Sequence, residues 1–177
     1  LINAVPLTGR ADYASLWTDE IDGEVIWKLK RVNPDESRLG AAFFRESGSV
    51  VLYAPSLKLL QTFDVANDIR YAAYITHDND RGAGKSAYLI KKYVGDPEKA
   101  PGLVDLKLLR ASEFYLIRAE AYAEQGNLSA AAKDLNALRR ARIRNYTDVT
   151  FANKESLLSA VLEERFKELA FEGHRFF

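Results

Sequence analysis

The stretch LRASEFYLIRAEAYAEQGNLSAAAKDLNALRRAR, residues 109–142, decides the fold of this 177-residue chain. Around its first half, apolar residues recur mostly at three- and four-residue steps, which predicts a helix that ends at Gly126 and Asn127. The apolar face of this helix is expected at Leu106, Leu109, Phe114, Ile117 and Ala121. A second helix is predicted to follow, with Leu128, Ala131, Leu135 and Leu138 on one face. Together the two segments predict a helical hairpin.

A third helix is predicted near the C-terminal end. Asn153 can cap it, and Glu155 in its first turn favours the helix dipole. Its apolar face is expected at Leu158, Val161, Leu162, Phe166 and Leu169.

The hairpin also fits one copy of the tetratricopeptide template. The matching positions are Tyr115, Ala119, Tyr122, Ala131 and Leu135, whereas Arg118 replaces the leucine of the template. A second copy at the same period would begin near residue 149, and none is visible there. Because a single repeat cannot bury its own apolar face, we expect the hairpin to pack on other elements.

Residues 1–102 are irregular, with short apolar runs broken by turn signals. EVIWKLKRV, residues 24–32, is typical of a strand, and SLKLLQTF, residues 56–63, has helical spacing. Glycines and prolines at 95–102 mark a connector before the helical half, residues 103–177. We therefore expect one mostly α domain over residues 1–177, with a tetratricopeptide-like helical hairpin, further helices, and a loop-rich half that contains short strands.

Composition limits the classes of function. The 25 Lys and Arg balance the 25 Asp and Glu, so no basic excess would attract nucleic acid. The chain has no cysteine, and its two histidines, His77 and His174, belong to no metal-binding motif, so we nominate no metal-binding residue and no cofactor, while isolated oxygen ligands leave metal binding open. No apolar run approaches the ~20 residues that a membrane-spanning helix needs.

GAGKS, residues 82–86, raises the question of a phosphate-binding loop and hence of a nucleotide hydrolase. Such a loop needs a glycine five positions before Gly84, where this chain has Asn79. YAAYI, residues 71–75, is compatible with a strand, and the residues after Ser86 favour a strand over a helix. A glycine-rich turn between two extended segments is therefore the better prediction.

Beyond these patterns, residues 109–142, followed by VLEERFKELAFEGHRFF at 161–177, closely resemble the C-terminal part of the SusD/RagB family. Upstream, GEVIWKL (23–29), YAPSLKLL (53–60), NDIR (67–70) and KKY (91–93) stand in the expected order. The resemblance implies the second portion of a family member, without the lipid-anchor cysteine and most of the tetratricopeptide-like helices.

The resemblance also implies a function. Members of this family are surface lipoproteins of the outer membrane that capture a nutrient and deliver it to a TonB-dependent, SusC-like barrel, over which they form a lid. For this chain it implies non-catalytic capture of an oligosaccharide or another nutrient, with membrane contact only through a lipid anchor absent from these residues. The alternative is a tetratricopeptide-type adaptor that binds peptides in a helical groove.

Charged residues in the helical half are expected to form ion pairs rather than a catalytic site. Those that carry the resemblance are Arg118, Glu120, Arg139 and Arg142. Glu164, Glu168 and Glu172 share one helix face, with nothing to raise one pKa selectively as glycoside hydrolysis requires. His174 is expected to pack or cap. No catalytic residue is nominated.

Candidate ligand-binding residues lie in the irregular half, because rigid scaffolds usually display binding groups on loops. Phe43, Phe44, Arg45 and Tyr53 combine flat apolar faces with a guanidinium donor fork, as a glycan site needs. Trp17 and Trp27 could also stack on sugar rings, but their apolar surroundings favour the core for both.

Overall fold

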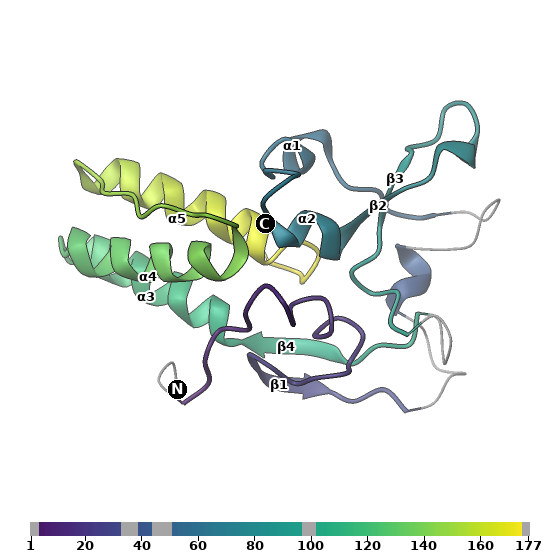
Figure 1. Ribbon diagram of the computed structural model, residues 1–177, viewed down its shortest axis with the longest axis horizontal. Helices are drawn as coiled ribbons and strands as arrows, with labels where there is room; N and C mark the ends of the chain where they lie inside the picture. The colour runs from purple at the N-terminus through teal and green to yellow at the C-terminus, as the bar shows by residue number, and fades with distance from the viewer. Residues whose placement is uncertain (1–3, 33–38, 44–50, 97–101, 175–177) are drawn as a thin grey trace. The chain divides into compact units, whose positions relative to one another are not determined.

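The structure, a computed structural model, describes residues 4–32, 39–43, 51–96 and 102–174 (Figure 1). Its contacts divide the chain into two compact units. Unit 1 consists of Leu1–Arg10, Gly23–Trp27 and Lys107–Phe177, and unit 2 of Ala11–Asp22 and Lys28–Leu106. The mostly helical fold class predicted from the sequence is confirmed.

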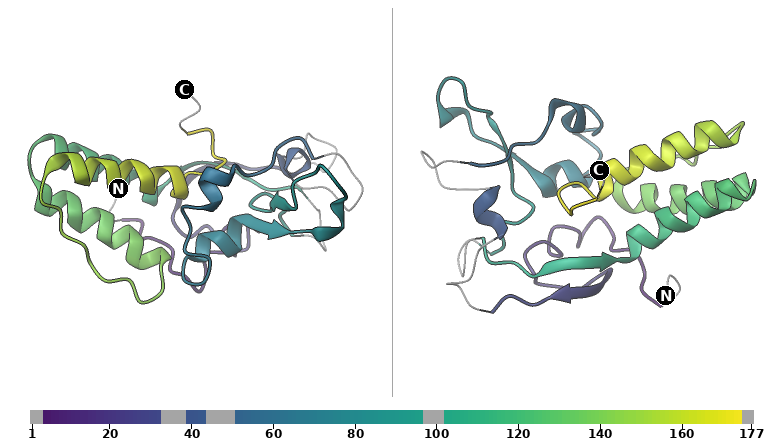
Figure 2. Two further views of the ribbon diagram at one scale, coloured as in Figure 1. Left: turned by 90° about the horizontal axis from the view of Figure 1, so that it is seen from above. Right: turned by 180° about the vertical axis from the view of Figure 1, so that it is seen from behind.

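The three long helices belong to unit 1: α3 (Ala111–Glu124), α4 (Leu128–Arg142) and α5 (Lys154–Glu168). They lie side by side (Figures 1 and 2), and α3 packs against both others. Asn127 caps α4 by accepting a hydrogen bond from Ala130 N at 3.2 Å, and Asn153 caps α5 by accepting one from Ser156 N at 2.8 Å. The predicted hairpin, its turn and the third helix are thereby confirmed.

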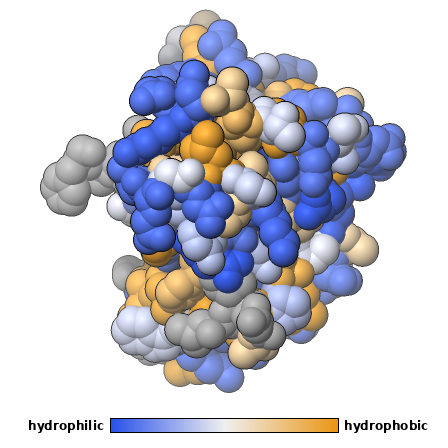
Figure 3. Space-filling view, turned by 90° about the vertical axis from the view of Figure 1, so that its left-hand side faces the viewer, coloured by the Kyte–Doolittle hydropathy of each residue, from blue (hydrophilic) through white to orange (hydrophobic). Residues whose placement is uncertain are grey.

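The core of unit 1 is built from small and branched side chains. Its most deeply buried members are Leu116, Ala119, Ala123, Ala131, Leu135, Leu138, Leu157 and Val161. Burying each leucine stabilises the fold by about 1.5–3 kcal/mol, and the alanines let the helix backbones approach one another. The side of unit 1 at the free helix ends is mostly hydrophilic (Figure 3).

Two of the predicted apolar faces were only partly correct: Val161 and Leu169 belong to the core as expected, but other members do not. Leu106 and Leu109 belong to strand β4 (Leu106–Arg110), and Ile117 on α3 is 46% exposed. On α5, Leu162 is 38% exposed, whereas Glu164 and Glu168 are fully buried. The periodicity argument failed because it assumes that only apolar residues face the core, whereas here paired charges do.

A buried ion cluster in unit 1 consists of Glu24, Arg110, Arg142, Glu168 and Glu172. Glu24 binds both arginines, since Oε1 accepts from Arg110 Nη1 at 2.6 Å and Oε2 from Arg142 Nη2 at 2.7 Å. Glu168 Oε1 also accepts from both, at 3.0 Å each. Arg110 makes two further hydrogen bonds to Glu172, at 2.7 and 2.9 Å. No side chain of the cluster is more than 5% exposed.

Thr8 connects the N-terminal segment to this ion cluster. Its N donates to Glu24 Oε2 at 2.9 Å, its hydroxyl accepts from Glu24 N at 2.8 Å, and its carbonyl accepts from Arg142 Nη1 at 2.7 Å. Buried charges are tolerated only when they are paired and hydrogen-bonded. The cluster therefore fixes where residues 8 and 24 lie against the helices of unit 1.

Strand β1 (Val25–Leu29) and β4 form a two-stranded sheet. The predicted strand at 24–32 is confirmed, but Trp27 is 56% exposed, so the prediction that it belongs to the core was wrong. Trp27 lies on a two-stranded sheet, and the described residues leave more than half of its surface exposed.

Unit 2 is a set of short elements around an aromatic core. They are the 3-10 helix η1 (Leu39–Ala42), α1 (Leu57–Leu60), α2 (Ile69–Tyr74), β2 (Ile75–His77), the 3-10 helix η2 (Asn79–Arg81) and β3 (Tyr88–Ile90). Residues 71–74, considered as a strand from the sequence, are the end of α2, whose start Asp68 caps by accepting from Arg70 N at 3.0 Å. The strand starts only at Ile75.

In the described part of the chain, no helix is both long enough and apolar enough to cross a membrane.

Replacing Arg142 by Leu should lower the free energy of unfolding by about 3–5 kcal/mol, because Glu24 and Glu168 would lose a buried partner. Arg140→Leu is the matched control, since this side chain is 48% exposed and pairs at the surface with Asp148. It should cost less than about 1 kcal/mol. Urea unfolding followed by circular dichroism measures both, and equal losses would contradict the structural role of the cluster.

Candidate functional site

Two of the four predicted ligand-binding residues lie together in unit 2. The ring centroids of Phe43 and Tyr53 are 5.8 Å apart. Leu52 N and Tyr53 N both donate to Ala42 O, at 3.2 and 3.3 Å, which holds this segment beside η1. Phe44 and Arg45 lie outside the described residues, and the binding role of all four stays a prediction.

The position of Phe43 depends on a close backbone approach at Gly40. A Cβ at Gly40 would lie 2.2 Å from Tyr93 O and 2.7 Å from Gly102 Cα, so only glycine fits. Gly40 N donates to Gly102 O at 3.3 Å. With η1 held there, the Phe43 ring contacts Tyr93 at a centroid distance of 5.5 Å.

Tyr53 is the exposed end of this aromatic group. It is 60% exposed, as is its neighbour Leu52, whereas Phe43 is half-buried and Tyr93 is buried. A flat ring that is supported from below and open to solvent can stack on the apolar face of a sugar, and its hydroxyl can hydrogen-bond to the sugar. We refer to Phe43 and Tyr53 as the aromatic platform.

Beneath the platform the rings continue into the core. Tyr93 contacts Trp17 at 6.1 Å, and Trp17 in turn contacts Tyr13 and Tyr74, at 6.3 and 5.7 Å, each in an edge-on arrangement. The hydroxyls of Tyr13 and Tyr74 share a hydrogen bond. Trp17 is 3% exposed, so the prediction that it belongs to the core is confirmed.

A buried lysine lies against this aromatic core. Lys92 Nζ lies 3.9 Å from the ring centroid of Tyr74 and 4.1 Å from that of Trp17, and the side chain is fully buried. A desolvated ammonium over aromatic faces stabilises the contact by about 2 kcal/mol. Lys92 thus fixes the orientation of both rings.

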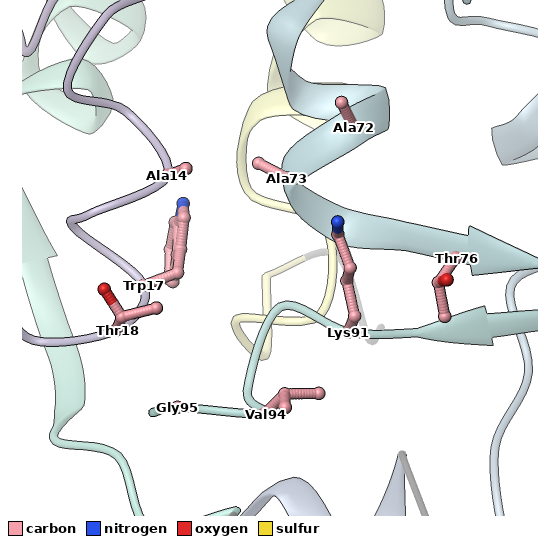
Figure 4. Close-up of a pocket in the computed structure, with 9 residues that line it drawn as sticks. All are labelled: Ala14, Trp17, Thr18, Ala72, Ala73, Thr76, Lys91, Val94 and Gly95. Carbon is pink, nitrogen blue, oxygen red and sulfur yellow. The ribbon is translucent and has the colours of Figure 1, made fainter. Parts of the chain in front are cut away.

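Sequence reasoning missed a cavity of about 290 Å³ in unit 2. Trp17 and Thr18 lie on one side of it, Lys91 and Thr76 on the other, and small residues complete it (Figure 4). These are Ala14, Ala72, Ala73, Val94 and Gly95. No motif marks such a cavity, because alanine and glycine contribute by leaving space.

GAGKS forms the tip of a hairpin and not a phosphate loop. β2 and β3 pair antiparallel, with Ile75 opposite Ile90 and His77 opposite Tyr88. Gly82 and Gly84 adopt φ of +84° and +79°, and Lys85 is followed by a strand rather than by a helix N-terminus. The predicted glycine-rich turn is confirmed.

The charged residues weighed from the sequence are engaged in ion pairs. Arg118 Nε lies 2.6 Å from Asp134 Oδ2, Arg139 Nε lies 2.7 Å from Glu164 Oε2, and Arg165 Nη2 lies 3.3 Å from Glu120 Oε2.

The pKa values of two of these arginines are shifted. The hydrogen bond to Asp134 raises the pKa of Arg118. Burial opposes the charge of Arg139, but Glu164 and Tyr146 raise its pKa overall. These ion pairs give Arg118 and Arg139 a structural role in holding the helices together.

Glu164, Glu168 and Glu172, the carboxylates considered for glycoside hydrolysis, are all held by arginines. His174 Nδ1 lies 3.7 Å from Glu113 Oε1, consistent with the packing role expected for it. Among the described residues no group of three or more metal-ligating side chains is assembled.

A second hollow, of about 480 Å³, lies in unit 1 beside the start of α4. Asn136 holds its outer wall, since its side chain bonds Val149 O at 3.0 Å, Val149 N at 3.2 Å and the Tyr146 hydroxyl at 2.7 Å. This hollow is where a peptide would lie if unit 1 acted as an adaptor.

The chain is similar to known proteins in both sequence and fold. The family described as the SusD family matches residues 30–177. No curated protein matches the chain. Three solved structures that resemble it come from Bacteroides. A SusD superfamily protein from Bacteroides thetaiotaomicron has a TM-score of 0.75 at 22% identity, over 96% of this chain and 40% of that one.

The second is a SusD-like carbohydrate binding protein from Bacteroides vulgatus, with a TM-score of 0.71 at 26% identity, over 97% of this chain and 37% of that one. The third is surface glycan-binding protein A from Bacteroides uniformis, with a TM-score of 0.68 at 21% identity, over 99% of this chain and 41% of that one. The chain thus spans about two fifths of the length of these structures.

The exposure of the two tryptophans gives a direct test of the core. Trp27→Phe should remove most of the fluorescence that acrylamide quenches, because Trp27 is 56% exposed and Trp17 only 3%. Trp17→Phe, the matched control, should leave the quenched component in place. Steady-state quenching of the 177-residue chain measures both, and an unchanged quenching curve for Trp27→Phe would refute the exposure of that residue.

Proposed function

Because the chain belongs to the SusD family, we propose that it captures an oligosaccharide at the cell surface without transforming it. Two of the similar structures are named for carbohydrate or glycan binding, which supports this class of ligand. The observation that carries the proposal in this chain is the aromatic platform, where Tyr53 is exposed and its ring is supported by Phe43.

The platform suits capture rather than chemistry. A sugar ring presents apolar C–H faces and a rim of hydroxyls, so a flat ring with a polar tip meets both. Support from Phe43, and from Tyr93 below it, holds Tyr53 in place before the ligand arrives, which lowers the entropy cost of binding. Phe44 and Arg45, adjacent in sequence to Phe43, would add a second flat face and a donor fork to the site.

Delivery of the ligand completes the proposed function. The protein would act as an outer-membrane lipoprotein on the cell surface and pass the oligosaccharide to a TonB-dependent, SusC-like barrel. The support for this step is the family resemblance of the helical half, where the motifs at 109–142 and 161–177 are found.

Tyr53→Ala should weaken glycan binding about tenfold, because one stacked ring contributes about 1 kcal/mol or slightly more. Tyr53→Phe keeps the flat face and should retain most of the affinity. Leu57→Ala is the matched control, since Leu57 is also an exposed apolar side chain of unit 2, at 71%. A glycan array on the full-length protein identifies a ligand, and calorimetry then compares the variants.

The proposed binding site would be wrong if Tyr53→Ala and Leu57→Ala bound the ligand equally well. Peptide binding without glycan binding would instead support the tetratricopeptide-type adaptor, with the hollow beside α4 as its site.

Affinity purification of the full-length protein from detergent-solubilised membranes should recover a large TonB-dependent barrel, identified by mass spectrometry. A stoichiometric barrel partner is expected because capture at the surface is useful only beside a transporter. Recovery of the protein from the soluble fraction, with no barrel, would contradict delivery of the ligand to a transporter. The capture of an oligosaccharide would then be decided by the glycan-binding measurements alone.

A further inference from the structure

We propose that the 290 Å³ cavity of unit 2 is a subsite for a single sugar unit that carries an anionic group, a carboxylate or a sulfate, bound by Lys91. This inference rests on the proposed glycan capture and adds the charge of the ligand. The aromatic platform would bind the neutral face of the chain, and the cavity would select an acidic unit.

The size of the cavity fits one ring. Ligand pockets usually enclose about 300–1,000 Å³, so a cavity at the lower end holds a monosaccharide unit rather than a chain. The cavity lies between α2 and the segment after β3, with Ala72 and Ala73 on one side and Val94 and Gly95 on the other (Figure 4).

The walls of the cavity are fixed before a ligand binds. Trp17 is held by three edge-on ring contacts and by the ammonium of Lys92. At Gly95, φ is +69°, and a Cβ would lie 2.7 Å from Leu103 O and 2.9 Å from the Val104 side chain. Such a wall cannot collapse into the cavity, so the space persists in the unbound protein.

Among the described residues that line the cavity, Lys91 is the one ionisable side chain, so their charge is positive. Its side chain extends along the cavity toward Ala73 (Figure 4), and no described carboxylate pairs with its ammonium. Its backbone N donates to Tyr74 O at 2.8 Å, which anchors the residue. Thr76, on the same side, offers a hydroxyl to a sugar.

On the opposite wall, Thr18 Oγ1 donates a hydrogen bond to Glu20 Oε1 at 3.0 Å, and Glu20 also accepts one from Ser15. Glu20 does not line the cavity. Among the described lining residues, an anionic group would therefore meet one ammonium and no carboxylate, an arrangement that favours acidic over neutral sugars.

Calorimetry on the full-length protein tests this with three probes of equal length: an oligogalacturonate, a carrageenan oligosaccharide that carries sulfate but no carboxylate, and a neutral maltooligosaccharide. At least one acidic probe should bind about tenfold more tightly than the neutral one, and the comparison of the two acidic probes identifies the anionic group. Lys91→Met should remove this preference, Lys91→Arg should keep most of it, and Ala72→Leu should block the cavity.

Lys85→Met is the matched control, because it removes the same charge from an exposed lysine at the hairpin tip of the same unit. Equal binding by Lys91→Met and Lys85→Met would overturn the subsite. The subsite would also be overturned if the neutral probe bound as tightly as the acidic ones and its binding depended on Tyr53 alone. That result would still support the proposed capture of an oligosaccharide. Failure to bind any glycan would overturn the subsite and the proposed function together.

Discussion

The fold of unit 1 depends on satisfying five charged side chains that are each at most 5% exposed to water. Glu24, Arg110, Arg142 and the pair Glu168 and Glu172 come from four separate places in the chain, yet each makes at least one charge-assisted hydrogen bond to another member. An apolar core tolerates small shifts in register, whereas a bidentate guanidinium–carboxylate contact is directional. The cluster therefore specifies where the ends of α4 and α5 meet β4 and the segment before β1, and the apolar helix faces fill in around that arrangement.

Local chemistry made much of this structure predictable. The helix end at Gly126 and Asn127, the cap at Asn153, the hairpin of α3 and α4, the strand within residues 24–32 and the turn at GAGKS all follow from side chains that act on their own neighbourhood. Errors arose where long-range partners decide the outcome. Periodicity assigns Glu164 and Glu168 to solvent, yet both are buried, because arginines distant in sequence neutralise them. Trp27 was placed in the core on local pattern alone, but its strand belongs to a sheet of only two strands.

The candidate site was predictable to a smaller degree. Aromatic residues in the irregular half pointed to Phe43 and Tyr53, which the fold brings into contact, whereas Phe44 and Arg45 lie outside the described residues. The cavity gave no signal, because most of its lining is alanine, glycine, valine and threonine drawn from three segments of unit 2. Lys91 and Lys92 were visible only as a basic pair, and nothing in that pair indicates that one lines a cavity and the other is enclosed by Trp17 and Tyr74.

The enclosure of Lys92 has a chemical consequence. An amine-acylating reagent, or an acetyltransferase, needs a solvated and deprotonated ε-amino group. Lys91 presents its amine to solvent, whereas the amine of Lys92 is fully buried against two aromatic faces. Two adjacent residues of the same type therefore differ in nucleophilic reactivity, and covalent labelling at this pair distinguishes a folded aromatic core from an unfolded one, in which both amines react alike.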